Sequence, residues 1–142
     1  MMAQLEVTVN STNQKLGHTG ALRSHPAIPI DYIPPFGDGQ GYTPLELLLM
    51  SLGSCSGGTI GLLLRKMGKT VSKIKVNTKG IRREQHPTSF QTIFLEFVVN
   101  SEDVKDADIQ KAIKLAEGSV CPVWAMVKGN VQINTEYKII AS

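Results

Sequence analysis

The sequence contains little cysteine, little tryptophan and no strong excess of charge. Its 142 residues include 2 cysteines and 1 tryptophan, and the formal net charge is +3. A charge this small argues against binding to nucleic acid or to an anionic membrane surface. The first ten residues alternate polar and apolar side chains and lack the apolar core of a secretory signal. We therefore expect a cytoplasmic protein in a reducing compartment, where thiols are reactive or simply structural.

Sequence signals for several other chemistries are also missing. His18, His25 and His86 are scattered, and none makes a metal-ligand spacing with a cysteine. The chain has no GxSxG motif, no phosphate-binding loop and no dinucleotide fingerprint. No histidine is placed by the sequence beside a cysteine, as a Cys–His hydrolase would need. We expect neither a bound metal nor an organic cofactor.

The longest apolar stretch of the chain runs from Thr43 to Gly68 and predicts one long helix with Cys55 in its middle. Thr43 and Glu46 have the spacing of a capping box at the helix start. Pro44 suits the first helical position, where a backbone N–H is not needed. Basic residues in the last turn, followed by Gly68, are typical of a helix end.

The middle of this helix, Ser51 to Gly61, is rich in glycine and serine. Each glycine there costs about 1 kcal/mol relative to alanine. Close approach of another backbone, or room for a ligand beside Cys55, would offset that cost. The helix is apolar on nearly every side, which predicts burial on every side and therefore an obligate homodimer. Leu45 to Leu64 is also long enough to span a membrane, but its glutamate, serines and glycines argue against that interpretation.

The rest of the chain predicts strands and two shorter helices. The expected strands are Leu5–Val9, Lys15–Arg23, Ile28–Tyr32, Ile74–Thr78, Gln91–Val99 and Val131–Ile139. A second helix is expected over Asp106–Glu117, ending at Gly118, and a third over Pro122–Lys128. No strand–helix–strand unit repeats. This order predicts a single α+β domain over residues 1–142 with mostly antiparallel strand pairing.

Cys121 stands directly before Pro122, where the third helix should begin. Its sulfur is therefore expected near unpaired helix N–H groups, which favour the thiolate form. Two thiols that meet suffice for redox chemistry: one thiolate attacks a peroxide, and the other condenses with the resulting sulfenic acid to form a disulfide. The alternative is that Cys55 is an inert core residue in a tightly packed helix crossing.

Three segments of the chain resemble the OsmC/Ohr family of osmotically inducible and organic hydroperoxide resistance proteins. They are TPLELLLMSLGSC (Thr43–Cys55), GIRREQHPTSF (Gly80–Phe90) and IQKAIKLAEGSVCPV (Ile109–Val123). The resemblance covers nearly the whole chain and looks closest to a less characterised OsmC-like branch. It implies an OsmC-like α+β fold in an intertwined homodimer, with the active site at the dimer interface. It also implies reduction of an organic hydroperoxide by two cysteines, which a dithiol or a lipoyl-type reductant then recycles.

By position, the resemblance implies that Cys55 attacks the peroxide and that Cys121 is the resolving cysteine. Characterised members place a glutamate directly after the helix-start proline, whereas this sequence has Glu46 one residue later. Nine residues separate Glu46 from Cys55, which puts them on opposite faces of a straight helix at about 100° per residue. Glu46 is thus either a capping residue or part of a site built with another segment.

The family also uses an arginine from its N-terminal strands to steady the thiolate, and Arg23 is the one arginine of that region here. Arg82 and Arg83 are the other candidate cations. We expect a thiol-dependent peroxidase for organic hydroperoxides, with an apolar pocket beside Cys55. The alternative is a non-catalytic binding or redox-sensing protein that holds an apolar acid or thiol ligand in the same interface pocket.

Overall fold

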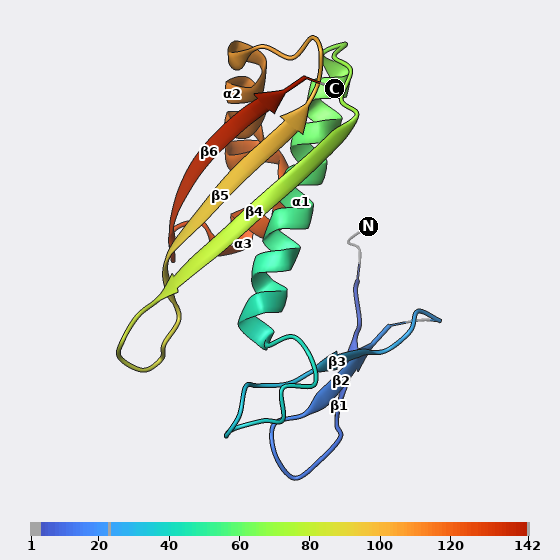
Figure 1. Ribbon diagram of the computed structural model, residues 1–142, viewed down its shortest axis with the longest axis vertical. Coiled ribbons are helices and arrows are strands. Elements are labelled where there is room, and N and C mark those ends of the chain that lie inside the picture. The colour runs from blue at the N-terminus through green and yellow to red at the C-terminus, as the bar shows by residue number, and fades with distance from the viewer. Residues whose placement is uncertain (1–3, 23, 142) are drawn as a thin grey trace. The chain divides into compact units, whose positions relative to one another are not determined.

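The computed structural model describes residues 4–22 and 24–141, which divide between Leu48 and Leu49 into two compact units (Figure 1). The boundary between the units falls within one helix, α1 (Pro44–Lys66). The single domain expected over residues 1–142 stays a prediction.

The first unit contains a three-stranded antiparallel sheet in the order β1-β2-β3. Its strands are β1 (Thr8–Ser11), β2 (His18–Ala21) and β3 (Ile28–Ile30). The second and third predicted strands are therefore present in shortened form, whereas β1 overlaps the predicted first strand, Leu5–Val9, only at Thr8 and Val9. Val7 and Val9 are 69% and 55% exposed, so this small sheet leaves apolar side chains uncovered within its own unit.

A buried carboxylate orders the loop that follows β3. Asp31 is 2% exposed and accepts hydrogen bonds from the N–H groups of Tyr32, Asp38 and Gln40 at 2.7, 3.1 and 3.2 Å. The bond from Tyr32 contributes most to holding the pKa of Asp31 below its ordinary value. The loop over residues 34–41 is thus tied to one anchoring side chain.

Both predicted ends of α1 are confirmed. The Thr43 N–H donates to Glu46 Oε1 at 2.8 Å, and the Glu46 N–H donates to Thr43 Oγ1 at 3.2 Å; together these bonds form the expected capping box. At the other end, Gly68 has a φ of +84° and donates its N–H to the Arg65 carbonyl at 2.9 Å. This glycine closes the helix in the left-handed conformation that other residues adopt at a cost.

The sheet of the second unit is mixed rather than antiparallel throughout. It contains β4 (Lys73–Arg82), β5 (Phe90–Asn100) and β6 (Gln132–Ile140) in that order. The pair β4–β5 is antiparallel, as predicted, whereas β5 and β6 run parallel. The helices between β5 and β6 form a crossover, which returns the chain to the end of the sheet where β5 began.

This crossover consists of α2 (Asp106–Leu115), a π-helical segment η1 (Ala116–Val120) and α3 (Pro122–Val127). The prediction that Gly118 ends the second helix is wrong, because Gly118 lies inside η1. The Cys121 N–H donates to the Ala116 carbonyl at 3.0 Å, a bond that spans five residues. This wide turn carries the chain from α2 to the start of α3.

The core of the second unit lies between the sheet and the three helices on one of its faces (Figure 1). Alternate residues of β5 point into it and are at most 1% exposed: Ile93, Leu95, Phe97 and Val99. Leu52, Ile60 and Leu64 of α1 are fully buried. Among the described residues, α1 is the one helix long and apolar enough to cross a membrane, but core helices share that property.

The predicted burial of α1 on every side is not achieved within this chain. Met50 and Leu62 are 44% and 50% exposed, and Ser54 and Gly58 are exposed between them. These four residues follow one another at four-residue spacing, so they form one stripe along the helix. We refer to Met50, Ser54, Gly58 and Leu62 as the open stripe.

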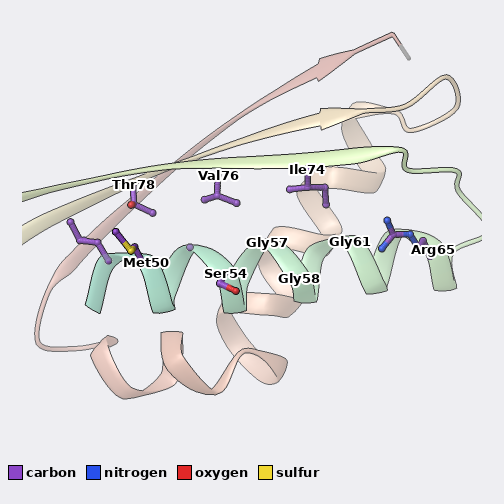
Figure 2. Close-up of a pocket in the computed structure, with 11 residues that line it drawn as sticks. Met50, Ser54, Gly57, Gly58, Gly61, Arg65, Ile74, Val76 and Thr78 are labelled. Atoms are coloured by element: carbon purple, nitrogen blue, oxygen red, sulfur yellow. The ribbon is translucent and has the colours of Figure 1, made fainter. Parts of the chain in front are cut away.

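The other glycines of α1 allow β4 to lie close against the helix (Figure 2). The residues in this contact are Gly53, Gly57, Gly61, Ile74, Val76 and Thr78. A Cβ atom on Gly57 would lie 2.6 Å from Val76 Cγ2, whereas a Cβ on Gly58 would meet nothing within 4 Å. Glycine at position 57 lowers the helix propensity of this segment, but a larger residue there would collide with β4 of the same chain.

We predict opposite effects on stability for alanine at these two neighbouring glycines. Gly57→Ala should lower the stability of the fold, since overpacking costs about 1–3 kcal/mol and outweighs the gain of about 1 kcal/mol in helix propensity. Gly58→Ala should keep that gain, because its methyl group meets no neighbour. Urea unfolding of both variants checks this, and equal shifts of the two midpoints would contradict the assignment of the contact.

Candidate active site

The two cysteines of the chain lie in contact within the second unit. Their Sγ atoms are 3.1 Å apart, and the Cys121 thiol donates a hydrogen bond to the Cys55 sulfur. Both thiols are free. A disulfide bond is about 2.05 Å long, so the sulfurs would need to approach by about 1 Å to form one. The residues are 66 positions apart in the chain, and the fold alone brings them together.

Cys55 is held by the buried side of α1. Its neighbours Leu52 and Ser56 are fully buried, and the Ser56 hydroxyl donates to the Leu52 carbonyl at 2.7 Å. This bond satisfies a polar group that the core would otherwise leave unpaired. Cys55 itself is half-buried, so its sulfur is the more accessible of the two.

Cys121 is held where the π-helical segment meets α3. Its backbone is extended, with φ −77° and ψ 111°, and it forms the N-cap of α3. The Trp124 N–H donates to Cys121 Sγ at 3.5 Å. The side chain is 2% exposed, which excludes it from bulk solvent.

Burial raises the pKa of the Cys121 thiol above its ordinary value. The hydrogen bond from the Trp124 N–H acts in the opposite direction, and donation of the thiol proton toward Cys55 raises the pKa further. The expectation that the helix start favours thiolate at Cys121 is therefore wrong. The physical reason is that α3 has 6 residues, and its N–H groups do not offset the loss of hydration.

Two of the other predicted site residues, Glu46 and Arg82, have side-chain partners of their own. The Glu46 carboxylate belongs to the first unit and caps α1 through Thr43. The Arg82 guanidinium donates to the Thr88 carbonyl at 2.7 Å and to the Thr88 hydroxyl, which holds it within its own hairpin. The backbone N–H of Arg83 donates to the Ser89 carbonyl. The Arg23 prediction lies outside the described residues.

A cavity of about 500 Å³ lies along α1 and β4, beside the open stripe (Figure 2). Arg65 stands at one end and donates to the Val71 carbonyl at 3.1 Å. Ser54 and Gly58 line the cavity, but Cys55 does not. The apolar pocket expected beside Cys55 is therefore not this cavity, and it stays a prediction.

A family model described as OsmC-like protein matches residues 37–136 of the chain. That match covers α1 and both cysteines. The chain belongs to the OsmC-like protein family. Over 100 residues it is also 33% identical to Protein YhfA of Escherichia coli K12, a match that spans 70% of this chain and 75% of YhfA.

Solved structures agree with this family assignment. A crystal structure of a hypothetical protein from Aquifex aeolicus is 30% identical, with a TM-score of 0.86, and the match covers 99% of each chain. An organic hydroperoxide resistance protein of Legionella pneumophila is 11% identical, with a TM-score of 0.75, and the match covers 96% of this chain and 99% of that chain. The second likeness shows a shared fold.

Sequence reasoning missed one residue of this OsmC-like site. Trp124 is the one tryptophan of the chain, is 1% exposed, and supplies the N–H that faces Cys121. Its indole N–H has no hydrogen-bond partner among the described residues. The signal in the sequence was its position three residues after Cys121, which is where an N-cap side chain accepts its bond. The described residues contain no cluster of three or more His, Cys, Asp or Glu suited to a metal ion.

We predict that Cys121 is alkylated at least about ten times more slowly than Cys55 in the native protein at neutral pH. Thiolate is the reactive form of cysteine. Because burial raises the pKa of the Cys121 thiol, this thiol stays protonated at a pH where an ordinary cysteine already ionises. Iodoacetamide labelling of the single variants Cys55→Ser and Cys121→Ser, read by peptide mass, gives the two rates. Equal rates in the folded variants, or faster labelling of Cys121, would contradict the burial and protonation argued here.

Proposed function

We propose that this OsmC-like protein is a thiol-dependent peroxidase that reduces organic hydroperoxides with Cys55 and Cys121. The observation that carries the proposal is the 3.1 Å separation of the two free sulfurs. Membership of a family in which the Legionella pneumophila relative is called an organic hydroperoxide resistance protein supports it. The proposed site of action is the cytoplasm.

The exposure of the two thiols supports the proposed order of their reactions. Cys55 is half-buried and Cys121 is buried, so a hydroperoxide reaches the Cys55 sulfur first. The Cys55 thiolate attacks the peroxide oxygen and becomes a sulfenic acid, while the other oxygen leaves as an alcohol. Cys121 then condenses with the sulfenic acid, which yields a Cys55–Cys121 disulfide and water. A dithiol or lipoyl-type reductant reopens that disulfide.

Glu46 acts in this proposal through the helix cap. Its carboxylate already accepts the Thr43 N–H at 2.8 Å, and that bond fixes the start of α1. In this proposal Arg82 stabilises its own hairpin, where its guanidinium donates to the Thr88 carbonyl. In this proposal the Glu46 carboxylate stabilises the start of α1 and does not contact the substrate.

The protein is proposed to act as a homodimer that packs the open stripe of one copy against that of another. Met50 and Leu62 supply exposed apolar surface. Between them, Gly58 has nothing within 4 Å of its would-be Cβ atom, which leaves room for a second helix at close range. Unpartnered apolar surface of this kind is typical of association sites.

We predict that leucine at Gly58 weakens the dimer while leaving the fold of the protomer intact. The larger side chain would keep the two helices apart without touching the chain's own sheet. Sedimentation equilibrium at micromolar concentration should give a dimer for wild type and for Gly58→Ala, and a shift toward monomer for Gly58→Leu. A stable wild-type monomer would rule out the dimer.

Replacement of Glu46 separates its structural role from a catalytic one. Glu46→Gln keeps an acceptor oxygen for the Thr43 N–H, so the melting temperature and the turnover of hydroperoxide should stay close to wild type. Glu46→Ala removes the bond to the Thr43 N–H but keeps the bond from the residue 46 N–H to Thr43 Oγ1, so it should lose about 0.5–1.5 kcal/mol of stability, the net contribution of one hydrogen bond. Loss of turnover in Glu46→Gln at an unchanged melting temperature would instead place this carboxylate in the chemistry.

The peroxidase proposal predicts different products for the two cysteine variants. Once one equivalent of cumene hydroperoxide has reacted to completion and the mixture has been quenched without dithiol, wild type should lose two hydrogens and Cys121→Ser should gain oxygen at Cys55. Cys55→Ser should consume no peroxide, because the more accessible nucleophile is gone. Intact-protein and peptide masses report all three results. Unmodified Cys55 in both wild type and Cys121→Ser would favour the binding or redox-sensing alternative.

A further inference from the structure

A thiolate that breaks a peroxide O–O bond releases an alkoxide, and an alkoxide is too basic to leave readily without a proton. A positioned acid typically speeds such a step by about 10²–10⁴-fold. If the proposed peroxidase function holds, a group beside the Cys55 sulfur that supplies this proton would speed the first step. The contacts around Cys55 indicate which group it is.

Of the charged side chains expected at the site, Arg82 donates to the Thr88 carbonyl and Glu46 accepts the Thr43 N–H, while Arg23 lies outside the described residues. Within the described part of the chain, the polar side-chain contact of the Cys55 sulfur is the hydrogen bond from the Cys121 thiol at 3.1 Å. The proton nearest to the reacting sulfur is therefore the one on Cys121.

We propose that Cys121 acts twice, first as the acid that protonates the departing alkoxide and then as the nucleophile that resolves the Cys55 sulfenic acid. In the free protein the Cys121 thiol keeps its proton and donates it in a hydrogen bond to the Cys55 sulfur. When a hydroperoxide approaches that sulfur, the same proton transfers to the oxygen that leaves.

The surroundings of Cys121 suit both states of its sulfur. At 2% exposure the thiol is shielded from water, and burial raises its pKa, so it holds its proton until the alkoxide forms. The Trp124 N–H, 3.5 Å from Sγ, then faces the thiolate that remains. A backbone N–H that donates to a charged sulfur stabilises it, which prepares Cys121 for the second step.

The two steps balance in atoms and charge. In the first, the Cys55 thiolate forms a bond to the terminal oxygen of ROOH, the O–O bond breaks, and the Cys121 proton converts the departing RO⁻ into ROH. Cys55 is then a sulfenic acid and Cys121 a thiolate. In the second, Cys121 attacks the Cys55 sulfur, the S–O bond breaks, and hydroxide leaves and becomes water by taking a proton from solvent.

The test compares Cys121→Ala with wild type in the first reaction of Cys55 with three electrophiles. Cumene hydroperoxide releases an alkoxide and needs the acid; peracetic acid releases a carboxylate and iodoacetamide releases iodide, and neither of these needs it. We expect the single-turnover rate with cumene hydroperoxide to fall by at least about 100-fold. The rates with peracetic acid and iodoacetamide should stay within a few-fold of wild type.

Cys121→Ser provides a second variant of nearly the same size, in which a hydroxyl replaces the thiol as a far weaker acid. It should also lose rate with cumene hydroperoxide selectively, even if Cys121→Ala does not fold. Equal losses with all three electrophiles would mean that Cys121 only positions Cys55, and an unchanged rate with cumene hydroperoxide would exclude the acid role. Wild type that is alkylated at Cys55 but consumes neither peroxide would overturn the proposed function itself, and this inference with it.

Discussion

The packing of α1 against β4 is the constraint on which the sulfur pair depends. A Cβ atom at Gly57 would lie 2.6 Å from Val76, so the helix and the strand approach one another as closely as glycine allows. This contact fixes α1 in the second unit and Cys55 with it. The π-helical segment fixes the other sulfur, because the bond from the Cys121 N–H to the Ala116 carbonyl sets where α3 begins.

The two cysteines differ in solvent exposure although their sulfurs are in contact. Cys55 is half-buried, while Cys121 is buried and has a raised pKa. A thiol that holds its proton in the resting protein is a poor first nucleophile, and this favours the order of reaction proposed here. The same proton is available once a leaving group needs it, so one desolvated side chain provides an acid and then a nucleophile.

The sequence was informative wherever the relevant contacts are local. Capping by Thr43 and Glu46 acts across three residues, and the alternation of β5 repeats every two, so both could be predicted. The parallel pairing of β6 could not, since it depends on where a three-helix crossover returns the chain. The π-helical segment around Gly118 could not be predicted, because glycine usually ends a helix and the sequence therefore indicated a helix end there. The resemblance to the OsmC/Ohr family indicated the cysteine pair, but a contact across 66 residues required the fold.

The contact between Cys55 and Cys121 can be tested without any peroxide, by equilibrating the protein with reduced and oxidised glutathione and measuring its intact mass. Two sulfurs held at 3.1 Å should form their own disulfide as soon as glutathione attacks or caps one of them. The account predicts two species across the whole range of redox potential, the dithiol and the internal disulfide, with no accumulated glutathione adduct. A stable glutathione adduct on Cys55 beside a free Cys121 thiol would contradict it.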